Sequence, residues 1–244
     1  MTKQLFLKSL LLLVIGIQAH AQKIHAHNDY VHQYPFWESY TAGAASIEVD
    51  VILKDGVLCV AHDEKDILPE NTLQRLYLDP LQKVVKAEGF KTLQLLIDVK
   101  KEAEASLAVL VKSIEEDYPA LKVNSQVKLV ISGSRPPAEA YSNYPDYIYF
   151  DHQEIDNWPA DISKIALLSQ PFYAYSFWKG DGELDVKALM NITSATEIAH
   201  NKGLPIRFWA TPDTLVAWKT ISGLGVDFIN TDHPYECVNF FWKF

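Results

Sequence analysis

The N-terminal part of the chain carries histidine, carboxylate and lysine side chains with the types and spacing of a metal-dependent hydrolytic site. They are His27, Glu48, Asp50, His62, Asp98 and Lys100. Carboxylates that gather at one point cannot all stay ionised without a cation among them, and oxygen ligands suit Mg²⁺ or Ca²⁺ better than Zn²⁺. Two histidines beside such an ion supply a general base and a general acid near neutral pH.

Each of these motifs, taken alone, also has a purely structural explanation. The histidines of 25–27 can be partly buried polar residues, Glu48 and Asp50 can form salt bridges, and Asp98 can pair with Lys100. Burying so many charged groups together without a function is costly. The joint pattern therefore favours a site, provided that the fold brings these residues together.

A hairpin is predicted to bring His62 back beside the two carboxylates that precede it. Only the segment 54–56 separates two apolar runs, which is too short for a crossover between parallel strands, and Asp-Gly between such runs is a strong hairpin signal. With a three-residue turn whose glycine is left-handed, Asp50 faces Val60 and Glu48 faces His62. The two carboxylates and the imidazole then point to the same face of the ribbon.

The rest of the chain alternates strands with helical stretches, which is typical of a parallel sheet with helical crossovers. Strands are predicted at 24–28, 46–52, 57–62, 93–99, 127–132, 147–151, 172–177, 204–209 and 226–231, and helices at 71–89, 104–117, 183–201 and, as the last, 214–224. With the return arm 57–62 assigned to the hairpin, eight parallel strands remain. The sequence thus predicts an α/β fold, a single (β/α)8 TIM-type barrel over 22–244 with a β-hairpin extension after strand 2. Such barrels place their chemistry at the C-terminal strand ends, where the residues above lie.

The first 21 residues have the three-part pattern of a secretory signal peptide. Lys3 and Lys8 precede an apolar run over 10–17, and small residues at 19–21 supply a cleavage site. The run is shorter than the about 20 residues that a membrane span needs. We therefore expect cleavage near Ala21 and a secreted or periplasmic protein without a transmembrane segment.

Composition and charge exclude several other classes of protein. A formal net charge of −9 and a pI near 5.3 argue against binding to nucleic acid or to anionic membranes by bulk charge. The 244 residues, 48% of them hydrophobic, have the composition of an ordinary globular protein. The two cysteines, Cys59 and Cys237, are too few for a disulfide-stapled scaffold, and we expect both to be free thiols.

Taken together, the motifs resemble the superfamily of glycerophosphodiester phosphodiesterases and phosphatidylinositol-specific phospholipases C. The resemblance is carried by His27, Glu48-x-Asp50, Asp55-Gly56, His62-Asp63, Asp98-x-Lys100 and the sequence GVDFINTD at 225–232. HAHNDY at 25–30, IEVDVILKDGVLCVAHDE at 47–64 and RFWATPD at 207–213 are similar to the group called altered inheritance of mitochondria protein 6. The resemblance implies an eight-stranded barrel, a divalent cation and cleavage of a phosphodiester. It also implies that His27 and His62 are an acid–base pair and that Lys100 contacts the phosphate. The metal ligands that it implies are Glu48, Asp50 and Asp98.

One departure from the glycerophosphodiesterase pattern is informative. That family follows its first catalytic histidine with arginine and glycine, whereas this chain has Asn28 and Asp29. Asn28 resembles the asparagine that offers its carbonyl oxygen to calcium in metal-dependent phospholipases C, so it is a fourth candidate ligand. The missing phosphate-binding guanidinium can be replaced by Arg207 from across the barrel, or that arginine can form a structural ion pair. Trp209, at the same strand end, is a further candidate for substrate binding.

These inferences predict a phosphoric diester hydrolase that uses one Mg²⁺ or Ca²⁺ and acts on a glycerophosphodiester, a phosphoinositide or a related phospholipid headgroup. The sequence implies no protein partner, and it leaves open which histidine is the acid. One alternative is an amidohydrolase-like metal hydrolase, which needs further histidines at the middle strand ends, where only His152 stands. Another is a catalytically inactive barrel that binds lipid headgroups or carbohydrate through its aromatic side chains.

Overall fold

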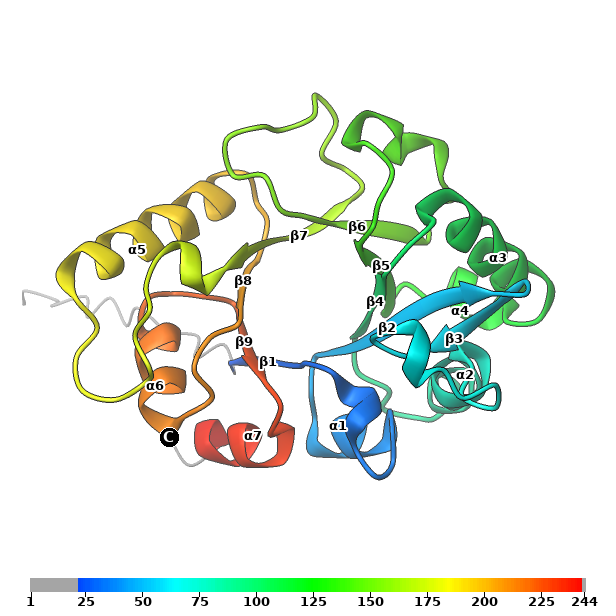
Figure 1. Cartoon of the computed structure of the whole chain (residues 1–244), viewed down its shortest axis with the longest axis horizontal. Helices are drawn as coiled ribbons and strands as arrows, with labels where there is room; N and C mark the ends of the chain where they lie inside the picture. The colour runs from blue at the N-terminus through cyan, green and yellow to red at the C-terminus, as the bar shows by residue number, and fades with distance from the viewer. Residues whose placement is uncertain (1–21, 243–244) are drawn as a thin grey trace, which may run out of the picture.

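Eight parallel strands close into a barrel in the computed structural model, which describes residues 22–242 (Figure 1). These strands are β1 (Lys23–Ala26), β2 (Ser46–Lys54), β4 (Leu93–Val99), β5 (Val127–Gly133), β6 (Ile148–His152), β7 (Ile165–Pro171), β8 (Ile206–Trp209) and β9 (Phe228–Thr231). β1 pairs with β9 on one side and with β2 on the other, which closes the ring. The expected fold is confirmed. The expected signal peptide at 1–21 lies outside the described residues.

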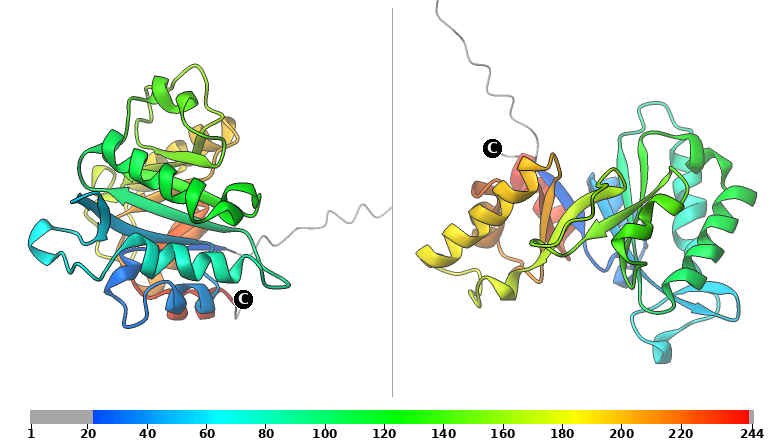
Figure 2. Two further views of the ribbon diagram at one scale, coloured as in Figure 1. Left: turned by 90° about the vertical axis from the view of Figure 1, so that its right-hand side faces the viewer. Right: turned by 90° about the horizontal axis from the view of Figure 1, so that it is seen from above.

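Helices pack around the outside of the ring (Figures 1 and 2). The α-helices are α1 (Trp37–Ala42), α2 (Asp79–Val84), α3 (Ala103–Glu116), α4 (Pro119–Val123), α5 (Val186–Asn201), α6 (Leu215–Gly223) and α7 (Pro234–Trp242). Shorter segments are the 3₁₀ helices η1 (Asp29–Val31), η2 (Glu64–Asp66), η4 (Ala138–Asn143) and η5 (Phe172–Ala174), and the π-helical η3 (Gln74–Leu78). The described chain forms only η4 between β5 and β6 and no helix between β6 and β7, so loops replace α-helices on this side of the barrel (Figure 1).

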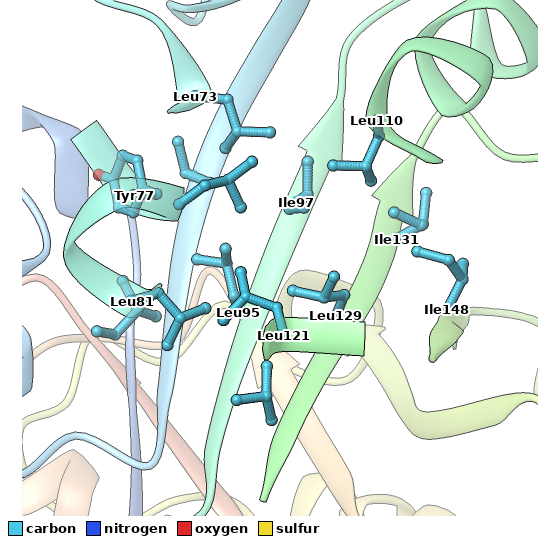
Figure 3. Close-up of a cluster of buried hydrophobic side chains, with 14 of the residues drawn as sticks. Leu73, Tyr77, Leu81, Leu95, Ile97, Leu110, Leu121, Leu129, Ile131 and Ile148 are labelled. Atoms are coloured by element: carbon cyan, nitrogen blue, oxygen red, sulfur yellow. The ribbon is translucent and has the colours of Figure 1, made fainter. Parts of the chain in front are cut away.

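The main hydrophobic core lies between the outer face of the strands and the helices α2 to α4 (Figure 3). On β4, Leu95 and Ile97 alternate with Leu96 and Asp98, because successive side chains of a strand point to opposite faces. Leu95 and Ile97 share this outer core with Leu110 of α3. Leu96 belongs to a separate, smaller apolar cluster. Asp98 follows Leu96 on the inner face, at the C-terminal end of the strand.

β2 turns back into β3 (Val57–Val60) as an antiparallel hairpin that extends beyond the ring of strands (Figures 1 and 2). Lys54 pairs with Val57, so the turn contains two residues and not three. These are Asp55 and Gly56, with φ of 50° and 79°. Positive φ at both central residues gives a type I′ turn, whose twist matches that of the flanking strands. The hairpin was expected, but the predicted register is wrong by one residue. The prediction assumed a three-residue turn, whereas the two-residue turn matches the twist of the strands.

Two assignments made from the sequence are wrong. The strand expected at 172–177 is β7 at Ile165–Pro171, and the chain forms η5 directly after it. Residues 165–170 are all buried, so they lack the alternation of polar and apolar residues by which a strand is usually recognised. The helix expected at 214–224 matches α6, but it is not the last, because α7 follows β9 and packs against α1.

Three smaller features complete the fold. The helix expected at 71–89 is confined to η3 and α2, which end at Val84. Cys59 and Cys237 are both buried and free, as expected. In the part of the chain from 22 to 242, no helix combines the length and the hydropathy needed to cross a bilayer.

Candidate active site

Two neighbouring parallel strands bring three carboxylates together at the C-terminal mouth of the barrel. Asp50 on β2 is the register partner of Asp98 on β4, and Glu48 lies two residues earlier on the same face of β2. One carboxylate oxygen from each residue lies within 4.8 Å of the other two. Glu48 is 5% exposed and Asp50 is 0% exposed, so bulk water has little access to these two, whereas the Asp98 side chain is 20% exposed.

This carboxylate group has the features of a site for a hard divalent cation. Asp50 Oδ1 is buried and has no hydrogen-bond partner among the described residues, and a bound ion or water is one way in which such an atom is satisfied. Burial raises the pKa of Asp98; the charge of Lys100 opposes this rise, and those of Glu48 and Asp50 add to it. A cation among the carboxylates would relieve their repulsion, and oxygen ligands suit Mg²⁺ or Ca²⁺.

Lys100 partly neutralises the same group from the loop that follows β4. Its Nζ lies 2.9 Å from Asp50 Oδ2 and 3.3 Å from Asp98 Oδ1. Burial lowers the pKa of Lys100, but the two carboxylates outweigh burial, so the pKa is raised overall. The side chain is 21% exposed. The ammonium therefore contacts the carboxylates and remains accessible from the mouth.

Glu48 is held by a buried polar network inside the barrel. Arg207 on β8 donates to Glu48 Oε2 at 2.5 Å, and His25 Nε2 lies 2.6 Å from the same oxygen. Burial raises the pKa of Glu48, but the charge of Arg207 and the hydrogen bond from His25 hold it well below its usual range. Burial and the charge of Arg207 lower the pKa of His25 to about 4. His25 is therefore neutral; its Nδ1 lies 2.7 Å from the Ser46 hydroxyl, and its Nε2 also contacts the Arg207 guanidinium.

His62 reaches the carboxylates from the hairpin. In the observed register Val51, and not Asp50, is opposite Val60, so strand alternation no longer places His62 on the carboxylate face. β3 ends at Val60, however, and His62 lies two residues beyond the ladder. Its Nδ1 lies 2.7 Å from Asp50 Oδ2. The side chain is 63% exposed, which leaves most of the imidazole open to a substrate.

His27 follows β1 and faces a carboxylate from the end of β9. Its backbone N–H donates to Thr231 O, and its Nδ1 lies 2.7 Å from Asp232 Oδ1. Burial lowers the pKa of His27, but the hydrogen bond to Asp232 and the charges of Glu48 and Asp232 outweigh burial and raise it. The hydrogen bond from His27 lowers the pKa of Asp232. Asp232 thus orients the imidazole and favours its protonated form.

The segment after β1 gives its polar residues different surroundings. Asn28 adopts a left-handed backbone with φ of 48°, a conformation that asparagine visits more readily than most residues. The Tyr30 hydroxyl donates to Asp50 Oδ2 at 2.7 Å and lies 3.2 Å from Asn28 Oδ1. Asp29 is fully buried and accepts the Tyr77 hydroxyl at 2.8 Å, so it organises the loop and does not face the site.

Arg207 and Trp209, the candidates for substrate contact, lie on the same strand in different surroundings. Arg207 is 3% exposed, and its second guanidinium nitrogen lies 3.6 Å from Asp151 Oδ2. Carboxylates inside the barrel therefore surround its charge. Trp209 is half-buried at the end of β8, with its ring edge-to-face against Tyr173 at 5.2 Å. Of the two, Trp209 is the one that a ligand can reach.

Three participants in the site were not among the residues expected from the sequence, namely His25, Tyr30 and Asp232. A signal existed for Asp232, because it directly follows the last strand, which must pair with the first when a barrel closes. His25 stood two residues from His27 but points to the interior of the barrel, where its role depends on Arg207. Tyr30 carried no signal, because its position depends on the left-handed turn at Asn28.

Two family models match this chain. Residues 15–94 match the model described as an AIM6-like phosphodiesterase domain, and residues 205–235 match that of the glycerophosphoryl diester phosphodiesterase family. Among curated proteins, the altered inheritance of mitochondria protein 6 homolog of Arthroderma benhamiae is 28% identical over 89% of this chain and 83% of its own length. Altered inheritance of mitochondria protein 6 of Kluyveromyces lactis is 24% identical over 89% of this chain and 71% of its own length.

Solved structures share the fold. A glycerophosphodiester phosphodiesterase from Agrobacterium tumefaciens superposes with a TM-score of 0.53 at 17% identity, over 90% of this chain and 95% of that chain. A calcium-dependent phosphoinositol-specific phospholipase C from a Pseudomonas species superposes with a TM-score of 0.56 at 13% identity, over 88% of this chain and 89% of that chain. At such identities the agreement concerns the barrel and its topology.

Proposed function

We propose that this chain, which belongs to the AIM6-like group within the superfamily of glycerophosphodiester phosphodiesterases and phosphatidylinositol-specific phospholipases C, hydrolyses a phosphodiester with a bound divalent cation. The observation that carries the proposal is the convergence of Glu48, Asp50 and Asp98. His62 contacts this group directly, and His27 follows the adjacent strand β1. A site that combines a cation with two imidazoles is equipped for phosphoryl transfer.

The proposed ligands of the cation are the three carboxylates, together with Asn28. The free oxygen of Asp50 and the hydrogen bonding of Tyr30 between Asp50 and Asn28 support this set. When bound, Mg²⁺ or Ca²⁺ would stabilise the negative charge on a phosphate oxygen and lower the pKa of a nearby hydroxyl. Lys100 sits beside the carboxylates, where its ammonium can contact the phosphate.

His27 and His62 are proposed to move the protons. One imidazole removes a proton from the attacking hydroxyl, and the other protonates the leaving oxygen. Asp232 supports His27 in either role, because its hydrogen bond at Nδ1 leaves Nε2 for the substrate. Asp50 holds His62 in the same way through Nδ1.

Arg207 and Trp209 receive different roles. Because the guanidinium of Arg207 is buried against Glu48, we assign it to keeping that carboxylate ionised and in place. Trp209 is the aromatic side chain on β8 that can pack against a substrate. The phosphate-binding cation that the Asn28 position lacks is then provided by Lys100.

The proposed substrate is a glycerophosphodiester, a phosphoinositide or a related phospholipid headgroup, since two of the solved structures that share the fold carry the names of enzymes for such diesters. If the substrate has a hydroxyl beside the phosphate, attack is internal and gives a cyclic phosphate. We also propose that the barrel spans residues 22–244 and works outside the cytoplasm, secreted or periplasmic. The support for this location is the signal-peptide pattern at 1–21.

The test is turnover by the purified protein with and without a cation. Protein stripped with EDTA is assayed against glycerophosphocholine, glycerophosphoinositol, phosphatidylinositol vesicles and bis(p-nitrophenyl) phosphate, before and after Mg²⁺ or Ca²⁺ is restored. We expect hydrolysis of at least one diester, and only with the cation present. Hydrolysis that EDTA leaves unchanged, or none with any diester, would contradict the proposal.

The surroundings of His152 disfavour the amidohydrolase-like alternative. Its Nε2 lies 2.8 Å from Glu154 O and 3.0 Å from Asn157 O, and its side chain packs against Trp158. His152 therefore holds the loop after β6. A cation in the barrel would have no histidine ligand from the middle strands, which that reaction class requires.

A further inference from the structure

A cavity of about 270 Å³ lies beside the proposed metal site, on the side of the barrel formed by β5 and β6. Gly133, at the end of β5, forms part of its wall. A Cβ atom on Gly133 would lie 2.2 Å from Asp98 Oδ1, so this wall is in contact with the Asp98 carboxylate. A group esterified to a phosphate at the metal site is therefore within reach of the cavity.

Arg135 is the cationic side chain in this cavity, and its hydrogen bonding is incomplete. One terminal nitrogen donates to Gly133 O at 3.1 Å, and the guanidinium also bonds the Tyr141 hydroxyl. Arg135 Nε is buried without a partner, and over residues 22–242 no carboxylate forms an ion pair with this arginine. A buried N–H without an acceptor is costly. A ligand oxygen that enters the cavity reaches the guanidinium at its terminal nitrogens, and a turn of the side chain toward the ligand would also satisfy Nε.

Both walls of the cavity are fixed before a ligand arrives. Prolines at 136–137 restrict the backbone directly after Arg135. On the opposite wall, His152 Nε2 lies within hydrogen-bond distance of the carbonyl oxygens of Glu154 and Asn157, which fixes this loop. Because these walls are already in place, only the Arg135 side chain has to adjust, so binding a ligand costs little entropy. The geometry is that of a preformed subsite.

The charges around the cavity favour an anion in its buried part. Glu139 and Glu154 also line it, but both are exposed, and Glu154 accepts a hydrogen bond from Asn157 Nδ2 at 2.7 Å. Solvent and salt screen such exposed charges. Arg135 is less exposed than the two glutamates, so its guanidinium is the charged group that an anion inside the cavity meets.

We propose that this cavity binds an oxyanion carried by the group esterified to the scissile phosphate, and that Arg135 selects it. The planar fork of a guanidinium matches a carboxylate or a second phosphate. A volume of about 270 Å³ suits a headgroup and is at the small end of ligand pockets. The link to catalysis rests on the proposed function, whereas binding of the anion does not.

The binding test uses metal-free protein in EDTA, so it is independent of turnover. Titration calorimetry with inorganic phosphate compares the wild type with R135Q and with R75Q, which removes an exposed arginine of η3. We expect R135Q to raise the Kd by about tenfold or more, because charge-assisted bidentate hydrogen bonds are among the strongest, and R75Q to leave the Kd unchanged. In the wild type, the NMR signal of the Arg135 Nε–H should shift as phosphate is added, which tests the site even if R135Q fails to fold.

The proposal is overturned if the wild type does not bind phosphate, if folded R135Q binds it equally well, or if the Arg135 signal does not move. Steady-state kinetics then test whether the subsite affects substrate choice. The quantity is the ratio of kcat/KM for an anionic diester to that for a neutral diester. R135Q should lower this ratio about tenfold either for a diester that carries a carboxylate or for one that carries a second phosphate, and assays with both diesters show which of the two anions the subsite binds. An unchanged ratio in both arms contradicts selection by Arg135. If the wild type hydrolyses no diester, the proposed function fails while calorimetry still decides the anion site.

Discussion

The Asp50 carboxylate uses its two oxygens in different ways. Oδ2 is contacted by Tyr30, His62 and Lys100, whereas Oδ1 is buried and has no partner among the described residues. The contacts to Oδ2 fix the orientation of the carboxylate, so the direction of Oδ1 is set before a cation binds. Outer contacts of this kind orient metal ligands and tune their affinity.

Gly133 permits the close approach of Asp98, which leads to a prediction. A Cβ there would lie 2.2 Å from Asp98 Oδ1 and 2.5 Å from Val99 O. Gly133→Ala must therefore displace the carboxylate, and we expect the affinity for Mg²⁺ or Ca²⁺, measured by calorimetry, to fall about 10–100-fold. Gly203→Ala is the matched control, because Gly203 also has a positive φ, of 72°, but has no atom within 4 Å of the added Cβ. Equal affinities in the two variants would show that Gly133 does not position Asp98.

Asp232 sets the pKa of His27, which leads to a second prediction. The carboxylate stabilises the imidazolium, so Asp232→Asn removes that stabilisation and the pKa of His27 falls. If His27 acts as the acid, the alkaline limb of the pH–rate profile moves to lower pH. If it acts as the base, the acidic limb moves to lower pH. A profile that does not move, or that moves to higher pH, would show that His27 is not the group whose protonation controls turnover.

At the scale of elements, the β2–β3 hairpin delivers His62 to a carboxylate on its own strand. The type I′ turn at Asp55 and Gly56 fixes the register of the two arms. Beyond the ladder the chain is free to turn, and His62 Nδ1 comes to lie 2.7 Å from Asp50 Oδ2. The hairpin thus adds a short return, which ends in a functional side chain, before the chain crosses over to β4 through η3 and α2.

The turn makes a prediction about stability. Gly56 has φ of 79° with nothing within 4 Å of an added Cβ, so Gly56→Ala introduces backbone strain and no clash. We expect the free energy of unfolding, measured by urea denaturation, to fall by about 1 kcal/mol. Gly223→Ala on α6, where φ is not positive, should leave stability unchanged or slightly higher. Equal changes in the free energy of unfolding for the two substitutions would show that the positive φ at residue 56 does not require glycine.

Local sequence signals predicted much of the fold, and their limits are physical. Alternation and the Asp-Gly pair predicted β2, the hairpin and the grouping of Glu48 with Asp50. Alternation could not locate β7, because both of its faces are buried. It also could not fix the direction of His62, which lies beyond the paired strand. The partners of Glu48 could not be predicted either, since Arg207 comes from the opposite side of the closed barrel.

At the scale of the whole molecule, closure of the barrel assembles the site from distant parts of the chain. Residues that follow β1 and β9 become neighbours, as do the ends of β2 and β4. The site gathers at least three carboxylates, so the folded protein contains like charges that its unfolded chain keeps apart. Binding of a cation should therefore be coupled to the stability of the entire fold.

That coupling gives a prediction for thermal unfolding. A cation at 100 times its Kd should stabilise the wild type by about 2.7 kcal/mol, which corresponds to a rise in Tm of about 5–10 °C for a domain of this size. Asp98→Asn should show a much smaller rise at the same concentration, because a ligand charge is lost. Differential scanning calorimetry with and without EDTA measures both. A rise of the same size in the variant would place the cation elsewhere.

The most direct test of the central claim separates the proposed cation ligand Asp50 from the proposed proton carriers His27 and His62. The measurement is kcat as a function of Mg²⁺ or Ca²⁺ concentration for Asp50→Asn, His27→Asn and His62→Asn, on a diester that the wild type hydrolyses. We predict that excess cation partly restores turnover in Asp50→Asn. We predict that the two histidine variants lose about 10²–10⁴ in rate and that no cation concentration restores it. Full activity in both histidine variants, or recovery of either with added cation, would contradict the account.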